Sequence, residues 1–459
     1  MALAHPAPVP RLTGLSAPLR WAALLALAAL LVIGGGAALD AWRAHRAAVS
    51  ADPAALSPGF GPRNYFEALA RADGGVDEAR RRLAMAPGEW LREEGLARQL
   101  VSRHRLTGDY ADLAEAERLL DDATARAPDP GGPVLSQAQL AVLLHRLAAA
   151  EAALAEFARF AAPEPGESAD AEALRGDIAL QRGQMDEAAR HYARGEALAP
   201  SAGLELRSAV LDLRRGHRDA AREAMNRLLL RPRQSPAALA QLALQRAALA
   251  YAEGSWDEAR RWIAAADRTF PGYWLVEAHG AQALALSGRT AEAIGAYAAV
   301  ARKSQAPEVM DALALLLRME GRPKQSREWS DRAGKLWQER LARFPEAARQ
   351  HAAEHELIAG NPERAVALAR ADVAARPHGA AIVVLARALV LAGRPAEALA
   401  CLDRAQAQGW TSAGSLMQRA EAEAALGNGP ASAAARTRAE AINPRAADPR
   451  TRLIWFGHD

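Results

Sequence analysis

One stretch of the sequence has the residue types and the spacing of a zinc site. His351, Glu354 and His355 spell H-x-x-E-H, and two histidines four residues apart lie on the same face of a helix, as in one class of zinc peptidases. Catalytic zinc also needs a third protein ligand and an open position for water, and the next helix offers no acidic pair for that role. A metal-dependent hydrolase is therefore the alternative hypothesis, and the simpler interpretation places both histidines in an ordinary helix.

Other motifs of enzyme chemistry are missing from the sequence. Cys401 is the single cysteine, which excludes an internal disulfide and a metal site built from several cysteines. No phosphate-binding loop, dinucleotide-binding glycine motif or serine-hydrolase elbow occurs. Adjacent carboxylates such as Glu93 and Glu94 point to different faces of a helix. We therefore predict no catalytic residue, no metal site and no cofactor.

The composition favours a helical protein with a core of small side chains. Of 459 residues, 50% are hydrophobic but only 5% are aromatic, so alanine and leucine must supply most of the core, and alanine is the strongest helix former. The 57 basic residues nearly balance the 54 acidic ones, and no long basic run occurs. Nucleic-acid binding needs a clustered basic patch, so we expect no nucleic-acid partner.

An apolar run near the N-terminus predicts a membrane segment. Residues Trp21 to Leu39 carry no charge, and about 19 helical residues at about 1.5 Å each nearly cross the roughly 30 Å hydrocarbon core of a bilayer. The run is longer than the apolar part of most signal peptides, although the small residues at 36–38 are compatible with cleavage. We expect a transmembrane helix or signal anchor at residues 19–39.

The charges that flank this run are balanced in number. Arg11 and Arg20 precede it, and Arg43 and Arg46 follow it, so the positive-inside comparison is a tie. Asp40 follows the run while no acidic residue precedes it, which resembles a signal anchor with a cytoplasmic N-terminus. We expect a single pass through the inner (plasma) membrane of a bacterium, with the body of the chain in the periplasm or otherwise outside the cytoplasm.

Glycine recurs through the rest of the chain at intervals of about 33 to 39 residues. These glycines are Gly183, Gly216, Gly254, Gly288, Gly321, Gly360, Gly393 and Gly427. A small residue stands seven positions before each of them and five positions after, and a proline closes several copies, as at Pro200, Pro271 and Pro377. Glycine ends helices because it adopts the left-handed conformation, and proline stops the second helix. The pattern predicts helical hairpins in tandem.

This pattern resembles the tetratricopeptide repeat (TPR), which has glycine at the turn, alanine early in the second helix and proline at the end. Tyr192 and Trp256 stand where that repeat commonly has aromatic residues. The resemblance implies an all-α fold, a right-handed solenoid of about 11 hairpins over residues 64–444, with weaker copies centred on Gly74 and Leu147. It also implies a concave groove, lined by the first helices, that holds protein or peptide partners.

These predictions divide the chain into five parts. They are an N-terminal tail at 1–18, the membrane segment at 19–39, a linker rich in proline and glycine at 40–63, the repeat array at 64–444, and a C-terminal cap or tail at 445–459. Exposed ends of a repeat array need covering, so we expect the last part to cap the final helix pair. The oligomeric state stays open.

The positions that line the groove in TPR proteins select six polar residues and one aromatic. Counted back from the turn glycines, they are Asp170, Asp177, Gln181, Arg214, Gln241, Tyr251 and Gln282. Their charges are mixed, so they do not define one class of ligand. Of the nearby aromatic residues, we expect Trp256, Trp262 and Phe270 in the core and Tyr251 in the groove.

The leading functional hypothesis is a membrane-anchored, non-catalytic scaffold that binds protein or peptide partners in this groove. One role that suits an anchored array without a second module is an assembly factor for a bacterial cell-envelope machine. The alternatives are the hydrolase centred on residues 351–355 and a purely structural spacer, in which every groove substitution would be silent.

Overall fold

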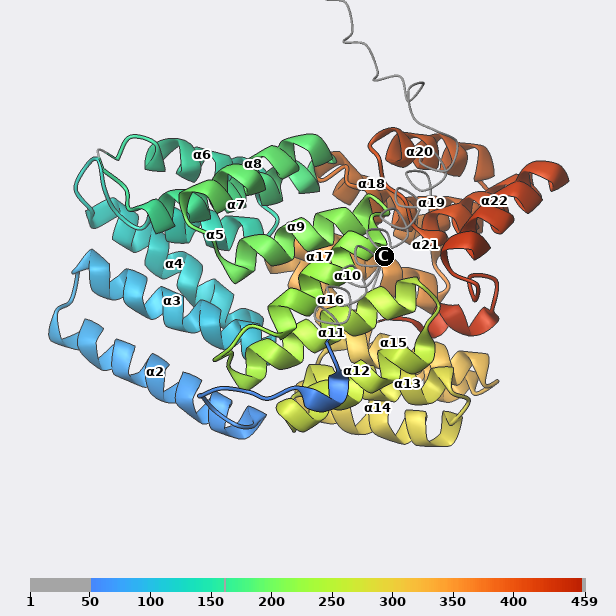
Figure 1. The fold of residues 1–459 in the computed structure, drawn as a ribbon, viewed down its shortest axis with the longest axis horizontal. Coiled ribbons are helices and arrows are strands. Elements are labelled where there is room, and N and C mark those ends of the chain that lie inside the picture. The colour runs from blue at the N-terminus through green and yellow to red at the C-terminus, as the bar shows by residue number, and fades with distance from the viewer. Residues whose placement is uncertain (1–50, 161, 456–459) are drawn as a thin grey trace, which may run out of the picture. The chain divides into compact units, whose positions relative to one another are not determined.

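A computed structural model describes residues 51–160 and 162–455 (Figure 1). Every regular element in these ranges is a helix, as the composition predicts. The described part begins with a 3-10 turn, η1 (Pro53–Ala55), and a long helix, α2 (Tyr65–Met85), and it ends with a second 3-10 turn, η2 (Pro449–Leu453). The predicted membrane segment at 19–39 lies outside these ranges, and no helix within them is long and apolar enough to cross a bilayer.

The twenty helices from α3 to α22 pair consecutively into ten hairpins. The first helices are α3 (Trp90–Thr107), α5 (Val134–Leu143), α7 (Pro165–Gln181), α9 (Ala202–Arg214), α11 (Pro236–Ala252), α13 (Trp274–Leu286), α15 (Pro307–Met319), α17 (Pro345–Ala359), α19 (Gly379–Leu391) and α21 (Ala413–Ala425). The second helices are α4 (Tyr110–Arg126), α6 (Leu147–Phe157), α8 (Met185–Leu198), α10 (Arg218–Leu229), α12 (Trp256–Thr269), α14 (Thr290–Ser304), α16 (Pro323–Arg343), α18 (Pro362–Ala375), α20 (Pro395–Ala407) and α22 (Gly429–Ile442). Each hairpin packs on the next, as in a solenoid.

A residue in the left-handed conformation lies at the turn of each hairpin. The predicted turn glycines, from Gly183 to Gly427, have φ angles between 68° and 89°, so the prediction of glycine turns is confirmed. Gly108 takes this place after α3, with φ at 75°. The copy centred on Leu147 has no glycine, and there His145 adopts the left-handed conformation at a φ of 60°.

The weak copy centred on Gly74 is not a hairpin, and that expectation is wrong. Helix α2 runs through Gly74 and Gly75 without a turn, and neither glycine has a positive φ. A helical glycine costs only about 1 kcal/mol relative to alanine, and packing offsets this, since Val76 is fully buried in a cluster with Leu96 and Leu100 of α3. The described array is therefore one unpaired helix followed by ten hairpins.

Small residues at the predicted columns bring the two helices of each hairpin together. The alanines after the turns are fully buried: Ala188, Ala221, Ala259, Ala293, Ala365 and Ala398. Because the two helices of a hairpin lie close together, a few large side chains can fill the space between one hairpin and the next. Trp262 and Phe270 are among these, with 1% and 0% of their surfaces exposed, which confirms their expected place in the core.

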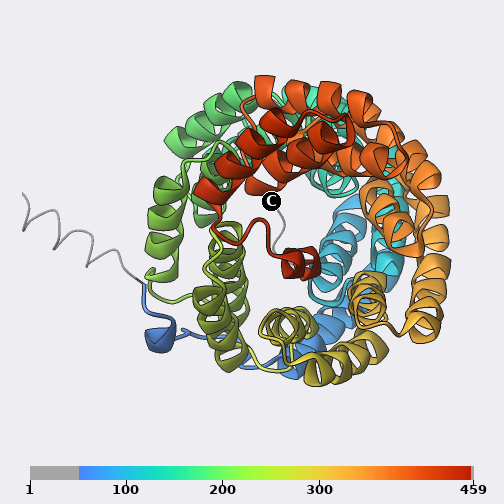
Figure 2. The ribbon, with the colours of Figure 1, turned by 90° about the vertical axis from the view of Figure 1, so that its right-hand side faces the viewer.

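The array coils so that later hairpins lie against the turns of earlier ones (Figures 1 and 2). Trp274, at the start of α13, donates its indole N–H to Leu106 O in the last turn of α3 at 3.2 Å. The backbone N–H of Thr411, before α21, donates to Arg214 O at 3.0 Å. Asn443, after α22, donates its side-chain N–H to Tyr251 O at 3.3 Å. The hairpins therefore do not form an open ribbon, because successive turns of the coil touch.

The segment before α2 is also held against the array. The N–H of Gly59 donates to Gln234 O at 2.7 Å, and the N–H of Tyr65 donates to Pro271 O at 3.1 Å. The rings of Tyr65 and Tyr273 stack with their centroids 5.8 Å apart. Residues 51–63, expected as the second half of a linker, thus form part of the packed body.

Gly176 gives a direct test of the close approach within a hairpin. It lies inside α7, and a Cβ there would overlap the ring of Tyr192 on α8, which is 1% exposed. We expect Gly176→Ala to lower the free energy of unfolding by about 1–3 kcal/mol, because overpacking outweighs the gain in helix propensity. Gly280 lies inside α13 with no atom near its Cβ position, so Gly280→Ala should raise the thermal midpoint or leave it unchanged. Equal effects of the two substitutions would contradict this packing.

Candidate binding surface

The first helices line the inner face of the coil. Consecutive first helices contact one another at α3–α5, α5–α7, α15–α17, α17–α19 and α19–α21. Elements on the inside of a curve lie closer together than those on the outside, so these contacts identify the concave side. Figure 2 shows the helices arranged around a ring, with the C-terminal segment that contains η2 inside it.

The predicted groove residues on α7 differ in their surroundings. Asp170 is exposed. Asp177 is half-buried, and its carboxylate accepts hydrogen bonds from Arg207 Nε and from the Tyr192 hydroxyl, each at 2.9 Å. Burial raises the pKa of Asp177 even though Arg207 acts to lower it. Gln181 contacts His145 of the preceding turn. Of the three predicted residues on α7, Asp170 is therefore the one that is exposed to solvent.

The predicted residues on α9 and α11 also divide into packed and open positions. The guanidinium of Arg214 lies 5.0 Å from the ring centroid of Trp410, so this residue joins α9 to a later hairpin. Gln241 is exposed on α11 and hydrogen-bonds to the Tyr273 side chain. Tyr251 is only 2% exposed, so it does not offer its ring to an external partner in this conformation.

The structure brings Tyr251 and Gln282 together beneath the C-terminal segment. Burial raises the pKa of Tyr251 to about 12, and the nearby Gln282 side chain acts to lower it. Gln282 is fully buried, and its side-chain oxygen accepts the backbone N–H of Trp455 at 2.6 Å. The two groove positions of α11 and α13 are therefore covered by a peptide segment that belongs to the same chain.

The sequence suggested that the C-terminal segment caps the last hairpin. In the structure this segment does more than that. Ala446 packs with α21 and α22, but η2 then crosses to α13 and α15. Leu453 and Trp455 are each 7% exposed, in the large cluster that includes Trp256. Sequence reasoning missed this placement, because the only local signal was an aromatic residue at the end of a segment without helical periodicity.

Two partly buried histidines lie where the coil meets itself. His145 is the turn residue after α5, and His378 precedes α19. Burial, and next the positive charge of Arg376, lower the pKa of each histidine to about 3. The ring Nδ1 of His145 lies 2.8 Å from the side-chain oxygen of Gln181. Both rings are therefore neutral near pH 7, in a region that already contains Arg376 and Arg214.

The histidines of the H-x-x-E-H motif are engaged with two different carboxylates. His351 Nδ1 lies 3.0 Å from a Glu354 oxygen, whereas His355 Nδ1 lies 2.7 Å from Asp311 on α15. Burial acts to lower the pKa of His355, but the hydrogen bond and charge of Asp311 outweigh it and raise that pKa. Within residues 51–160 and 162–455, no cluster of three or more His, Cys, Asp or Glu side chains has the arrangement of a metal site.

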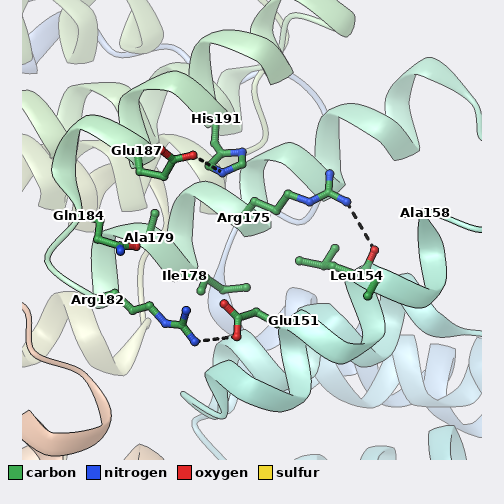
Figure 3. A pocket seen from close by; sticks show the side chains of 11 residues that line it. Glu151, Leu154, Ala158, Arg175, Ile178, Ala179, Arg182, Gln184, Glu187 and His191 are labelled. Carbon is green, nitrogen blue, oxygen red and sulfur yellow. Dashed lines mark hydrogen bonds and ion pairs between the residues drawn. The ribbon is translucent and has the colours of Figure 1, made fainter.

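A hollow of about 380 Å³ lies between α6, α7 and α8 (Figure 3). Its walls combine apolar side chains such as Leu154 with ion-paired groups. Arg182 pairs with Glu151 at 2.6 Å, and His191 pairs with Glu187 at 3.1 Å. The charges of these residues are matched within the hollow, which has no arrangement of nucleophile and base.

Several solved structures resemble this chain at low sequence identity. No family model matches the sequence, and no curated protein matches it either. A tetratricopeptide repeat protein from Parabacteroides merdae is similar in structure at 15% identity, covering 55% of this chain and 98% of its own, with a TM-score of 0.34. Yeast Tom70 is similar at 15% identity, covering 80% of this chain and 93% of its own, with a TM-score of 0.36.

A third similar structure is the APC/C hetero-tetramer Cut9–Hcn1, at 14% identity, covering 85% of this chain and 95% of the matched one, with a TM-score of 0.31. This chain itself has paired helices, left-handed turn residues and contacts between successive first helices. The described residues form an all-α solenoid of helical hairpins. The predicted fold class is confirmed to that extent.

The pH dependence of stability tests the neutral histidines of this solenoid. Their folded pKa values lie below the unfolded value of about 6.5, so the unfolded state binds more protons below pH 6.5 and stability falls as the pH falls. Between pH 7.5 and 5.5, each histidine should account for about 1.4 kcal/mol of lost stability. The substitutions His145→Asn and His378→Asn should each reduce this loss of unfolding free energy by about 1.4 kcal/mol. Chemical denaturation at both pH values measures it. A wild-type pH dependence in both variants would contradict the assignment.

Proposed function

We propose that this protein is a non-catalytic scaffold that holds protein or peptide partners on the inner face of its solenoid. The observation that carries the proposal is the peptide segment already seated there, with its backbone N–H bonded to Gln282. A surface that pairs with a peptide backbone and buries apolar side chains beside it has the chemistry of peptide recognition. Exposed inner-face positions such as Asp170 and Gln241 extend this surface beyond the seated segment.

We further propose that the scaffold is anchored in the inner membrane of a bacterium, with its body on the exported side. The support is the uncharged run Trp21 to Leu39 and the acidic residue that follows it. An anchored solenoid suits an assembly factor that gathers components of a cell-envelope machine. In this proposal the chain binds the membrane through residues 19–39 and the partner through the inner face of the solenoid, and the two do not depend on each other.

Site-specific photo-crosslinking in living cells tests the partner surface. A photo-reactive residue at Asp170 or Gln241 of the full chain should crosslink to the same discrete partner protein. The matched control is Arg190 on α8, a second helix, where the side chain is 60% exposed and no such product is expected. Equal labelling from the inner and outer positions, or none from either inner position, would count against the scaffold function and favour the structural spacer.

A reporter fused after residue 459 tests the membrane proposal. A reporter that is active only outside the cytoplasm should be active on the full chain and should lose that activity when residues 19–39 are deleted. Cytoplasmic activity of the full-length fusion would contradict the proposed side of the membrane.

A further inference from the structure

We propose that the segment from Asn443 to Trp455 is a built-in ligand that closes part of the inner face. In this proposal, which rests on the scaffold function above, the external partner of α11, α13 and α15 is a peptide of the same chemistry. That chemistry is a backbone folded into short turns, with arginines followed by a short apolar stretch that contains leucine and tryptophan. Partner binding then requires displacement of the segment.

The entry of the segment is fixed at the end of α11. Asn443 donates to Tyr251 O at 3.3 Å. A side chain at Gly254, whose φ is 75°, would collide with the side chain of Asn443. The end of α11 therefore provides the hydrogen-bond acceptor for Asn443, and Gly254 in the turn leaves the space for its side chain. The backbone of the segment enters the inner face at this point.

Arginine side chains hold the middle of the segment. The guanidinium groups of Arg445 and Arg450 lie 4.5 Å and 5.1 Å from the ring centroid of Trp256, within the range of cation–π attraction. Arg450 also donates to Leu286 O at 3.1 Å. Leu286 is the last residue of α13, and carbonyls at a helix C-terminus attract positive charge. This part of the surface selects arginine.

The end of the segment is recognised through its backbone and two apolar side chains. The Trp455 N–H is bonded to the fully buried Gln282 at 2.6 Å. Leu453 and Trp455 enter the cluster formed by residues of α11 to α16. Removing the segment would therefore leave Gln282 without the Trp455 N–H and would expose apolar surface. A polar acceptor beside exposed apolar surface is what a binding site for a peptide of like chemistry requires.

The geometry also makes the segment replaceable. It is held by a five-residue 3-10 turn and a few side chains, whereas each hairpin is held by two full helices. Arg452 is 67% exposed, and its 3.8 Å contact with Glu421 is weak. A tethered ligand competes at an effective concentration in the millimolar range. A partner of similar intrinsic affinity therefore binds the closed chain weakly and the opened chain well.

A labelled synthetic peptide of residues 443–455 tests this proposal. Its fluorescence anisotropy is followed while purified full chain is added, either wild type or carrying Leu453→Ala and Trp455→Ala to weaken the resident segment. We expect the double variant to bind the peptide at least tenfold more tightly than the wild type. The same peptide with alanine at the positions of Leu453 and Trp455 should not bind.

Two controls separate the possible failures. The matched variant Thr437→Ala, at an exposed position of α22, should bind the peptide as the wild type does. Circular dichroism reports whether the double variant is folded, and if it is not, excess peptide added to the wild type should accelerate hydrogen exchange at the Trp455 amide. A folded double variant that ignores the peptide, or an unchanged Trp455 amide, overturns the built-in ligand. Inner-face crosslinks in cells would then still support the scaffold function.

Discussion

The contact between early hairpin turns and late inter-hairpin loops determines the rest of this structure. At Gly183, Gly216 and Gly254 the left-handed conformation ends a first helix. The missing side chain leaves room for Gln408 at Gly183 and for Asn443 at Gly254, and Thr411 packs against Gly216. Where the turns face no later hairpin, as at Gly288 and Gly393, a Cβ would meet nothing within 4 Å. Glycine therefore ends the first helix at all of these turns. Only in the earlier hairpins does it also contact a later hairpin of the coil.

This closure shapes the inner face on which function depends. Because the coil returns onto itself, Arg214 and Gln181 contact other hairpins or turns. Fewer of the predicted groove residues are therefore exposed than in a solenoid whose turns do not touch. The C-terminal segment narrows the surface further by covering Tyr251 and Gln282. In the proposed scaffold, the C-terminal segment of the chain itself controls access to the partner surface.

Local signals in the sequence predicted the local structure well. The spacing of glycine, small residues and proline located the hairpins from α7 onward, because helix termination depends on the residues at the turn itself. Gly74 misled that reasoning, since packing of Val76 on α3 keeps the helix continuous, and His145 replaces glycine where the left-handed region still tolerates a polar side chain. The coil contacts and the seat of Trp455 join residues more than a hundred positions apart, so no local pattern encodes them.

Hydrogen exchange at three backbone amides tests the closure of the coil most directly. The N–H groups of Gly59, Tyr65 and Thr411 donate to Gln234, Pro271 and Arg214, and all three acceptors belong to distant parts of the array. An amide bonded in this way exchanges only when the contact opens. We predict slow exchange at all three amides in the folded full chain. Exchange at the rate of an unstructured peptide at these positions would contradict the stacked coil.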